Sequence, residues 1–185
     1  MEPSSSDTTP DDKVEQVQLH LNKEPRQSIL KRIETETAFD SDAIQHGVKM
    51  HDVMSRVITR DDFKSAISRL QRTEEERRQL TAQFEAAFKE TPQLLDWFTP
   101  KEGRSILTEQ SIYLGEYDRH RRPDRLIIEG DEAIVIDYKF GENTDVPQYR
   151  AQIKAYLSLL EKMGYNAKGY LWNWERTPQI VEVKK

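Results

Sequence analysis

Two aspartates and a lysine interrupt the most sheet-like stretch of this 185-residue sequence, "RRPDRLIIEGDEAIVIDYKFG", which spans 121–141. They are Asp124, Asp137 and Lys139. Burying a carboxylate is costly unless another group pairs with it. Acids inside an otherwise apolar β pattern therefore indicate that these positions carry chemistry.

A hairpin turn predicts how these residues meet. Gly130 and Asp131 lie between two apolar runs, which is typical of a two-residue β-hairpin loop. A register centred on that loop sets Asp124 directly opposite Asp137, with Cβ atoms about 5 Å apart. Lys139 follows on the same face, roughly 7 Å along the strand. A slip of one residue would turn Asp124 to the other face.

Two carboxylates at this separation repel each other by roughly 3 kcal/mol at an effective dielectric near 20. A hard divalent cation with oxygen ligands would relieve the repulsion, and Lys139 could orient or neutralise an incoming anion. The alternative is a solvated face, since acids and lysines on an amphipathic hairpin usually face water. The uninterrupted apolar run from Ala133 to Ile136 favours a covered strand instead.

The elements around the hairpin follow from the hydrophobic period. Residues 40–90 have a helical pattern, in which Ile44, Val48, His51, Met54 and Ile58 are predicted to share one stripe. Further helices are expected near 59–70, at 73–90 with a capping box, and at 145–164, where a glycine ends the helix. Strands are expected at 104–114, 124–130, 132–140, 168–174 and 179–183. The first 25 residues are predicted to be a disordered leader or linker, and 26–185 a single domain.

Composition limits the kind of site. There are no cysteines, which excludes disulfides, thiolate catalysis, zinc–thiolate sites and iron–sulfur clusters. Charged residues make up 33% of the chain and its net charge is -5, which argues against a generally basic surface but not against a local basic groove. No apolar run is long enough for a membrane span and the start does not resemble a signal peptide, so we expect a cytoplasmic location.

Three segments together, "RPDR", "VIDYKFG" and "QYRAQIKAY", resemble the PD-(D/E)XK nuclease superfamily. The similarity is specifically to the RecB-type nuclease domain at the C-terminus of UvrD/Rep-like helicase–nuclease proteins, and it spans about residues 40–183. It implies an α/β fold with a restriction-endonuclease-like core: a mixed sheet of about five strands flanked by helices, with an N-terminal helical segment.

The resemblance also implies roles for the residues already singled out. Asp124 and Asp137 would ligate Mg²⁺ or Mn²⁺, together with the backbone carbonyl of Tyr138. His51, in a G-x-x-x-H pattern, would be an additional metal ligand, although a lone histidine on an apolar stripe is also compatible with core packing. Lys139 would orient or activate the attacking water.

Further site residues are implied around this centre. Glu109 matches a strand glutamate, and Gln152 and Tyr156 match a Q-x-x-x-Y helix motif. The alternative for Glu109 is a solvated strand residue, and the alternative for Tyr156 and Tyr149 is packing on a helix stripe, beside which Gln152 lies. Nucleic-acid contacts are expected at the companion tyrosine and at three arginines of a basic cluster near the metal: Tyr149, Arg121, Arg122 and Arg125. An exposed loop is the alternative explanation for the arginines.

The function expected from the resemblance is that of a metal-dependent deoxyribonuclease of the exonuclease type. It would act in DNA repair or recombination on single-stranded DNA or unwound duplex ends, with a helicase motor in the same chain or complex, because no ATP-binding loop is present in the sequence. Two alternatives stay open: a catalytically silent DNA-binding or scaffolding module of the same fold, and a stand-alone nuclease of a defence or mobile element.

Overall fold

A computed structural model describes residues 41–112, 122–140, 147–174 and 180–185. The predicted leader at 1–25 lies outside these residues, and so does the start of the predicted domain. Among the helices of the described part of the chain, none has the length and apolar character needed to cross a membrane.

In the described residues before the sheet the chain forms α2 (Ser41–Met54), α3 (Asp62–Ile67), α4 (Glu74–Glu90) and α5 (Pro92–Trp97). The predicted capping box is confirmed at the start of α4. The Thr73 side chain accepts a hydrogen bond from the Glu76 backbone amide, and the Glu76 side chain accepts one from the Thr73 backbone amide. The chain leaves α4 at Thr91, which also precedes α5. The sequence analysis did not predict this short helix, although Pro92 is well suited to a first helical turn.

The sheet contains β1 (Arg104–Thr108), β2 (Arg125–Glu129), β3 (Glu132–Lys139), β4 (Asn166–Asn173) and β5 (Ile180–Glu182), in that spatial order. β1, β2 and β3 form an antiparallel meander, β4 is parallel to β3, and β5 is antiparallel to β4. The mixed five-stranded sheet flanked by helices confirms the predicted fold class.

The hairpin register is the one that the sequence predicted. Arg125 pairs with Ile136 and Glu129 with Glu132. Gly130 has a φ of 57°, a left-handed conformation that glycine adopts without steric cost. The turn therefore fixes which face each residue of β2 and β3 presents.

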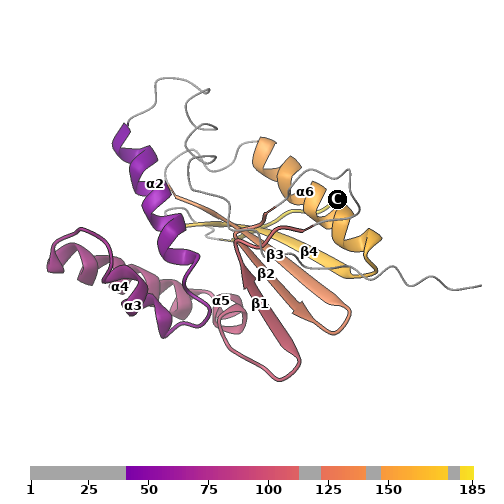
Figure 1. Cartoon of the computed structure of the whole chain (residues 1–185), viewed down its shortest axis with the longest axis horizontal. Helices are drawn as coiled ribbons and strands as arrows, with labels where there is room; N and C mark the ends of the chain where they lie inside the picture. Colours follow the sequence, from indigo (N-terminus) through magenta and orange to yellow (C-terminus); the bar gives the residue numbers. More distant parts are fainter. Residues whose placement is uncertain (1–40, 113–121, 141–146, 175–179) are drawn as a thin grey trace, which may run out of the picture.

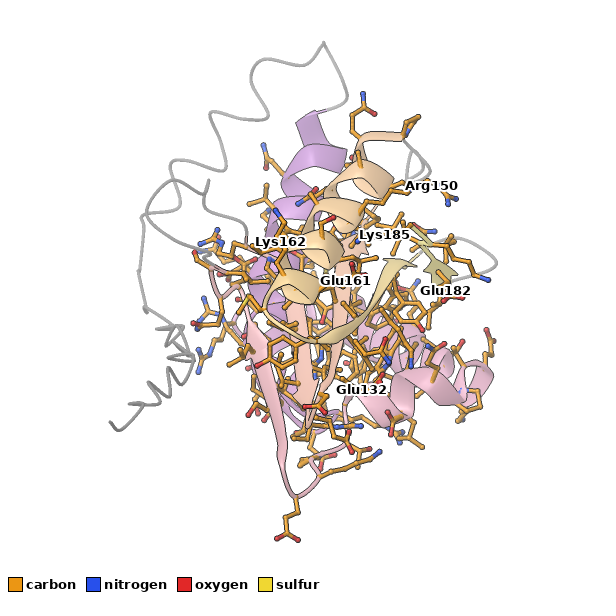
Figure 2. The ribbon with its side chains drawn as sticks, turned by 90° about the vertical axis from the view of Figure 1, so that its right-hand side faces the viewer. Glu132, Arg150, Glu161, Lys162, Glu182 and Lys185 are labelled. Carbon is orange, nitrogen blue, oxygen red and sulfur yellow. The ribbon has the colours of Figure 1, made fainter. Side chains whose placement is uncertain are left out.

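Helix α6 (Pro147–Lys162) makes the crossover from β3 to the parallel strand β4. It ends before Gly164, whose φ of 92° agrees with the predicted glycine cap. A Cβ added to Gly169 of β4 would lie 2.3 Å from the Ile153 side chain of α6, so the helix packs closely on the strand. Beside α6, the C-terminal Lys185 pairs with Glu161 (Figure 2).

Each face of the sheet has its own apolar core. Helices α2 to α5 lie on one side of the sheet (Figure 1), where buried side chains include Ile127, Ile136 and Trp172. Helix α6 packs on the other, over side chains that include Val135 and Leu171. Neighbouring residues of β3 thus enter different cores, because successive side chains of a strand point to opposite faces.

Three details of the predicted elements were wrong. The helix expected near 59–70 is limited to Asp62–Ile67. The strand expected at 104–114 ends at Thr108, because the next residue, Glu109, has a φ of 53° and leaves the extended conformation. The stripe expected on the first helix is confirmed at Met54, which is buried, but Met50 and Val53 outside the stripe are buried as well. Ile58, the last predicted member, lies beyond the helix and is 38% exposed.

Candidate metal centre

Three carboxylates form a row at one end of the sheet. The β1–β2 register, continued by one residue, sets Glu109 opposite Asp124, and the Glu109 amide donates to the Asp124 carbonyl at 3.1 Å. The β2–β3 register continued in the same way sets Asp124 opposite Asp137. This row is the arrangement that the hairpin argument predicted for the two aspartates, with Glu109 added on the next strand.

Asp124 is held from two sides. Its Oδ2 accepts a hydrogen bond from the Tyr138 backbone amide at 2.6 Å, and its Oδ1 lies 3.3 Å from Nδ1 of His51. Burial disfavours the charged carboxylate, but His51, Lys139 and the Tyr138 amide outweigh that effect, so the pKa of Asp124 lies below its ordinary value. Asp124 is therefore an ionised carboxylate that is held in a fixed orientation.

His51 lies at the rim of the core. Its side chain is 33% exposed, and its ring meets Phe140 edge to face at a centroid distance of 5.0 Å. Burial opposes protonation of this imidazole, but Asp124 outweighs the burial, so the pKa of His51 is raised. The fully packed core histidine that the helix stripe allowed is not what the structure contains.

His51, Glu109 and Asp124 can offer one ligand atom each, and these atoms lie within 4.8 Å of one another. We call these three residues the ligand trio. Two carboxylate oxygens and one imidazole nitrogen are a donor set that suits Mg²⁺ and suits Mn²⁺ better, since nitrogen ligands favour the transition metal. The residues present therefore fit a divalent cation.

Hydrogen bonds connect the end of α2 to the sheet beside the ligand trio. The Thr108 hydroxyl donates to the Ser55 carbonyl at 2.7 Å. The Arg125 guanidinium donates to the carbonyls of Val57 at 2.8 Å and Ile58 at 2.6 Å, just after the helix. These bonds join the end of α2, which carries His51, to the strand next to Asp124.

The expectation that Arg125 contacts nucleic acid was wrong. This residue is fully buried. It also donates to the Trp97 carbonyl at 2.9 Å and lies over the Phe98 ring at 3.9 Å. Its position on β2 explains the difference, because Arg125 points to the face opposite Asp124, into the core under α2 and α5.

Asp137 and Lys139 form a buried ion pair on the α6 face, with side-chain exposures of 4% and 12%. Burial and the neighbouring Asp124 raise the pKa of Asp137 to about 7, against the opposing effect of Lys139. Burial alone would lower the pKa of Lys139, but Asp137 and Asp124 raise it above the ordinary value. Lys139 is consequently a charged ammonium group beside the row of acids.

The three predicted residues of α6 occupy different positions. Tyr149 contacts the site, because Lys139 Nζ lies 3.9 Å from its ring centroid. The Gln152 amide donates to the Tyr156 hydroxyl at 2.9 Å, and Tyr156 is 2% exposed within the α6-side core. The ring of Tyr156 thus contributes to packing, and the roles of Gln152 and Tyr156 in the reaction stay predictions.

Of the two remaining arginines, Arg122 pairs with Glu109 at 3.1 Å, and Arg121 lies outside the described residues.

Asn173 is a buried polar residue that was not singled out from the sequence. This residue is 3% exposed and pairs with Lys139 in the β3–β4 register. A polar residue inside the aromatic run "LWNW" is the same kind of exception that drew attention to Asp137.

The family model described as the PD-(D/E)XK nuclease superfamily matches residues 25–184, most of the chain. No curated protein matches the sequence.

Proposed function

The chain belongs to the PD-(D/E)XK nuclease superfamily, and we propose that it is a metal-dependent deoxyribonuclease that hydrolyses phosphodiester bonds. The observation that carries this proposal is the convergence of the ligand trio with the Asp137–Lys139 ion pair at one end of the sheet. Helix α2, three strands and the first turns of α6 contribute to this point, which is far more specific than a D-x-K pattern alone.

The ligand trio would hold the cation, Mg²⁺ or Mn²⁺, and the family pattern adds Asp137 and the Tyr138 carbonyl as further ligands. A bound cation of this kind polarises the scissile phosphate and lowers the pKa of a coordinated water. Asp124 is oriented for this purpose by the Tyr138 amide. His51 supplies the nitrogen donor from the edge of the helix, where its exposure leaves it accessible to an ion.

Lys139 positions the attacking water and stabilises the negative charge that develops on the phosphate. It can do so because its carboxylate neighbours keep the ammonium group charged in a buried setting. Asp137 and the Tyr149 ring hold this ammonium group from two sides. Gln152 and Tyr156, one and two turns further along α6, are assigned by family pattern to support of the site.

The finer proposal rests on the resemblance to RecB-type domains. The domain acts as an exonuclease in DNA repair or recombination, on single-stranded DNA or unwound duplex ends supplied by a helicase motor in the same chain or complex. Arg121 and Arg122 contact phosphates near the site. The alternatives are a stand-alone nuclease and a catalytically silent module; the retention of every predicted carboxylate, the lysine and the histidine disfavours the silent module.

Cleavage assays test the proposal. Linear and circular single-stranded and duplex DNA are incubated with the protein in Mg²⁺, in Mn²⁺ and in EDTA. We expect cleavage in either metal and none in the chelator, with circular DNA resistant if the enzyme is an exonuclease. Equal cleavage in EDTA would exclude metal dependence.

Two variants separate the proposed roles. Asp124→Asn should abolish both cleavage and Mn²⁺ binding measured by calorimetry, because it removes a charged ligand. Lys139→Met should lower cleavage by about a hundredfold or more, the usual range for a group that stabilises transition-state charge, and leave Mn²⁺ binding largely intact. The assignment fails if Lys139→Met loses the metal and Asp124→Asn retains it.

A further inference from the structure

The Glu109 carboxylate has two competing partners. It belongs to the ligand trio, in which it lies within 4.8 Å of the ligand atoms of Asp124 and His51. One of its oxygens also pairs with Nη2 of Arg122 at 3.1 Å. A cation held by the ligand trio would draw on the same carboxylate and weaken its attraction for the guanidinium.

The backbone on both sides of this ion pair is constrained. Glu109 has a φ of 53°, a left-handed conformation that is uncommon for a side chain of this type and is often found at functional sites. Arg122 precedes Pro123, which is buried and restricts the backbone of the arginine to extended conformations. The guanidinium can therefore change partner through side-chain rotation, while both backbones stay in place.

The charges around the pair favour such an exchange. Burial and Asp124 raise the pKa of Glu109, and Arg122 opposes both effects. The arginine therefore stabilises the charged form of a carboxylate that burial and Asp124 disfavour. The Arg122 side chain is 30% exposed and so remains accessible to a ligand from solution. A phosphate group is a strong partner for a guanidinium, because it can accept two parallel hydrogen bonds.

We propose that Arg122 couples the binding of a nucleic-acid phosphate to the binding of the cation by the ligand trio. When the cation takes Glu109, Arg122 transfers to a phosphate of the substrate strand; when a phosphate takes Arg122, Glu109 becomes available as a ligand. Binding of the cation thus increases the affinity for the phosphate, and binding of the phosphate increases the affinity for the cation by the same factor, as linkage requires. This inference rests on the proposed function: Arg122 contacts the substrate phosphate directly and affects the cation through Glu109.

The first test measures Mn²⁺ binding without DNA, by calorimetry at fixed pH. Arg122→Gln should bind Mn²⁺ about two- to fivefold more tightly than the wild type, the range expected for loss of a partly exposed ion pair. Arg122→Lys should give a smaller increase. Arg60→Gln is the matched control, because Arg60 pairs with Glu85 at similar exposures, 40% and 30%, and neither residue belongs to the ligand trio.

A double-mutant cycle separates the specific pair from general repulsion between the arginine and the cation. In a Glu109→Gln background, Arg122→Gln should change Mn²⁺ affinity much less than it does in the wild type. The coupling is wrong if Arg122→Gln leaves Mn²⁺ affinity unchanged or weakens it. It is also wrong if the increase is equally large with and without Glu109.

The second test measures the linkage itself. Mn²⁺ titrations are repeated with a saturating fluorescein-labelled single-stranded oligonucleotide, in a Lys139→Met background that keeps the DNA intact. The factor by which the oligonucleotide tightens Mn²⁺ binding should be about two- to fivefold larger with Arg122 than with Arg122→Gln. Equal factors would overturn the coupling. A protein that binds Mn²⁺ and cleaves DNA but shows equal factors retains the proposed function, whereas a protein that binds no Mn²⁺ loses both.

Discussion

The Lys139 ammonium nitrogen lies 3.9 Å from the centroid of the Tyr149 ring. This contact connects the last residue of β3 to the first turn of α6, the crossover helix. A cation over an aromatic face is stabilised by the ring quadrupole, more strongly when the pair is shielded from water. The lysine of the D-x-K pattern is thus held by its own strand neighbour Asp137 and by a side chain that arrives from the following helix.

Substitution of Tyr149 tests this contact. Tyr149→Phe keeps the ring face and should retain cleavage within about twofold, whereas Tyr149→Leu should lower it by roughly three- to thirtyfold, the equivalent of about 0.7–2 kcal/mol for a shielded cation–π pair. Mn²⁺ affinity should hardly change in either variant. Tyr165→Leu is the packing control, since Tyr165 packs against the same core. Equal losses in Tyr149→Phe and Tyr149→Leu would show that the hydroxyl group matters and not the ring.

Truncation of His51 distinguishes a ligand from a packed core residue. His51→Ala should weaken Mn²⁺ binding by about tenfold or more and change the melting temperature in EDTA very little, because the side chain is one-third exposed. A packed residue would instead cost about 2–4 kcal/mol and several degrees. His46→Ala, on the same helix and outside the ligand trio, is the control. Thermal melts of the wild type and the variant with and without Mn²⁺ distinguish the two roles. A large drop in melting temperature in EDTA, with an unchanged increase on addition of Mn²⁺, would contradict the ligand assignment.

Arg125 should matter for stability and not for DNA contact. Arg125→Met leaves the carbonyls of Val57, Ile58 and Trp97 without their donor and should cost about 3 kcal/mol or more in urea unfolding. Arg125→Lys keeps the positive charge but not the planar guanidinium group, and should lower the stability less than Arg125→Met does. Arg69→Met, at an exposed position of the chain, should be nearly neutral. A stable Arg125→Met protein with weakened DNA binding would restore the nucleic-acid role.

The hydrogen bonds of Asp62 make the stability of the protein depend on pH. They lie in the segment whose carbonyls accept hydrogen bonds from Arg125. Its Oδ2 accepts from the Thr59 amide at 2.7 Å, the Ile58 amide at 3.1 Å and the Thr59 hydroxyl at 3.0 Å. The Thr59 bonds are the main reason that the pKa of Asp62 is lowered in the folded protein. Its contribution is therefore fully present above the unfolded pKa, about 3.9, and is lost as the pH falls through the lower folded value.

Asp62→Asn should thus destabilise the protein by about 1–2 kcal/mol at neutral pH, as expected for hydrogen bonds to a charged acceptor. The difference from the wild type should shrink as the pH approaches about 2. Urea unfolding across this range measures it. Asp61→Asn is the control, because the Asp61 side chain makes no capping hydrogen bond. A difference that stays constant with pH would show that the carboxylate charge contributes nothing.

The sequence by itself determined the hairpin and much of the fold. The glycine turn fixes the register from Arg125 to Ile136, and a one-residue slip would turn Asp124 away from Asp137 to the other face. The capping box at Thr73 and the glycine after α6 are local signals as well, and the structure contains both. Asp124, Asp137 and Lys139 could be placed together from the sequence because they lie on two adjacent strands of one hairpin.

The tertiary structure alone decided the contacts between distant segments. Nothing local to Arg125 distinguishes it from Arg122, yet one enters the core beneath α5 and the other pairs with Glu109, because strand alternation matters only once the helices cover a particular face. His51 and Glu109 meet Asp124 from separate elements. Their approach depends on how α2 docks and on where β1 ends, and both follow from packing and hydrogen bonds between segments that the hydrophobic period of each segment does not encode.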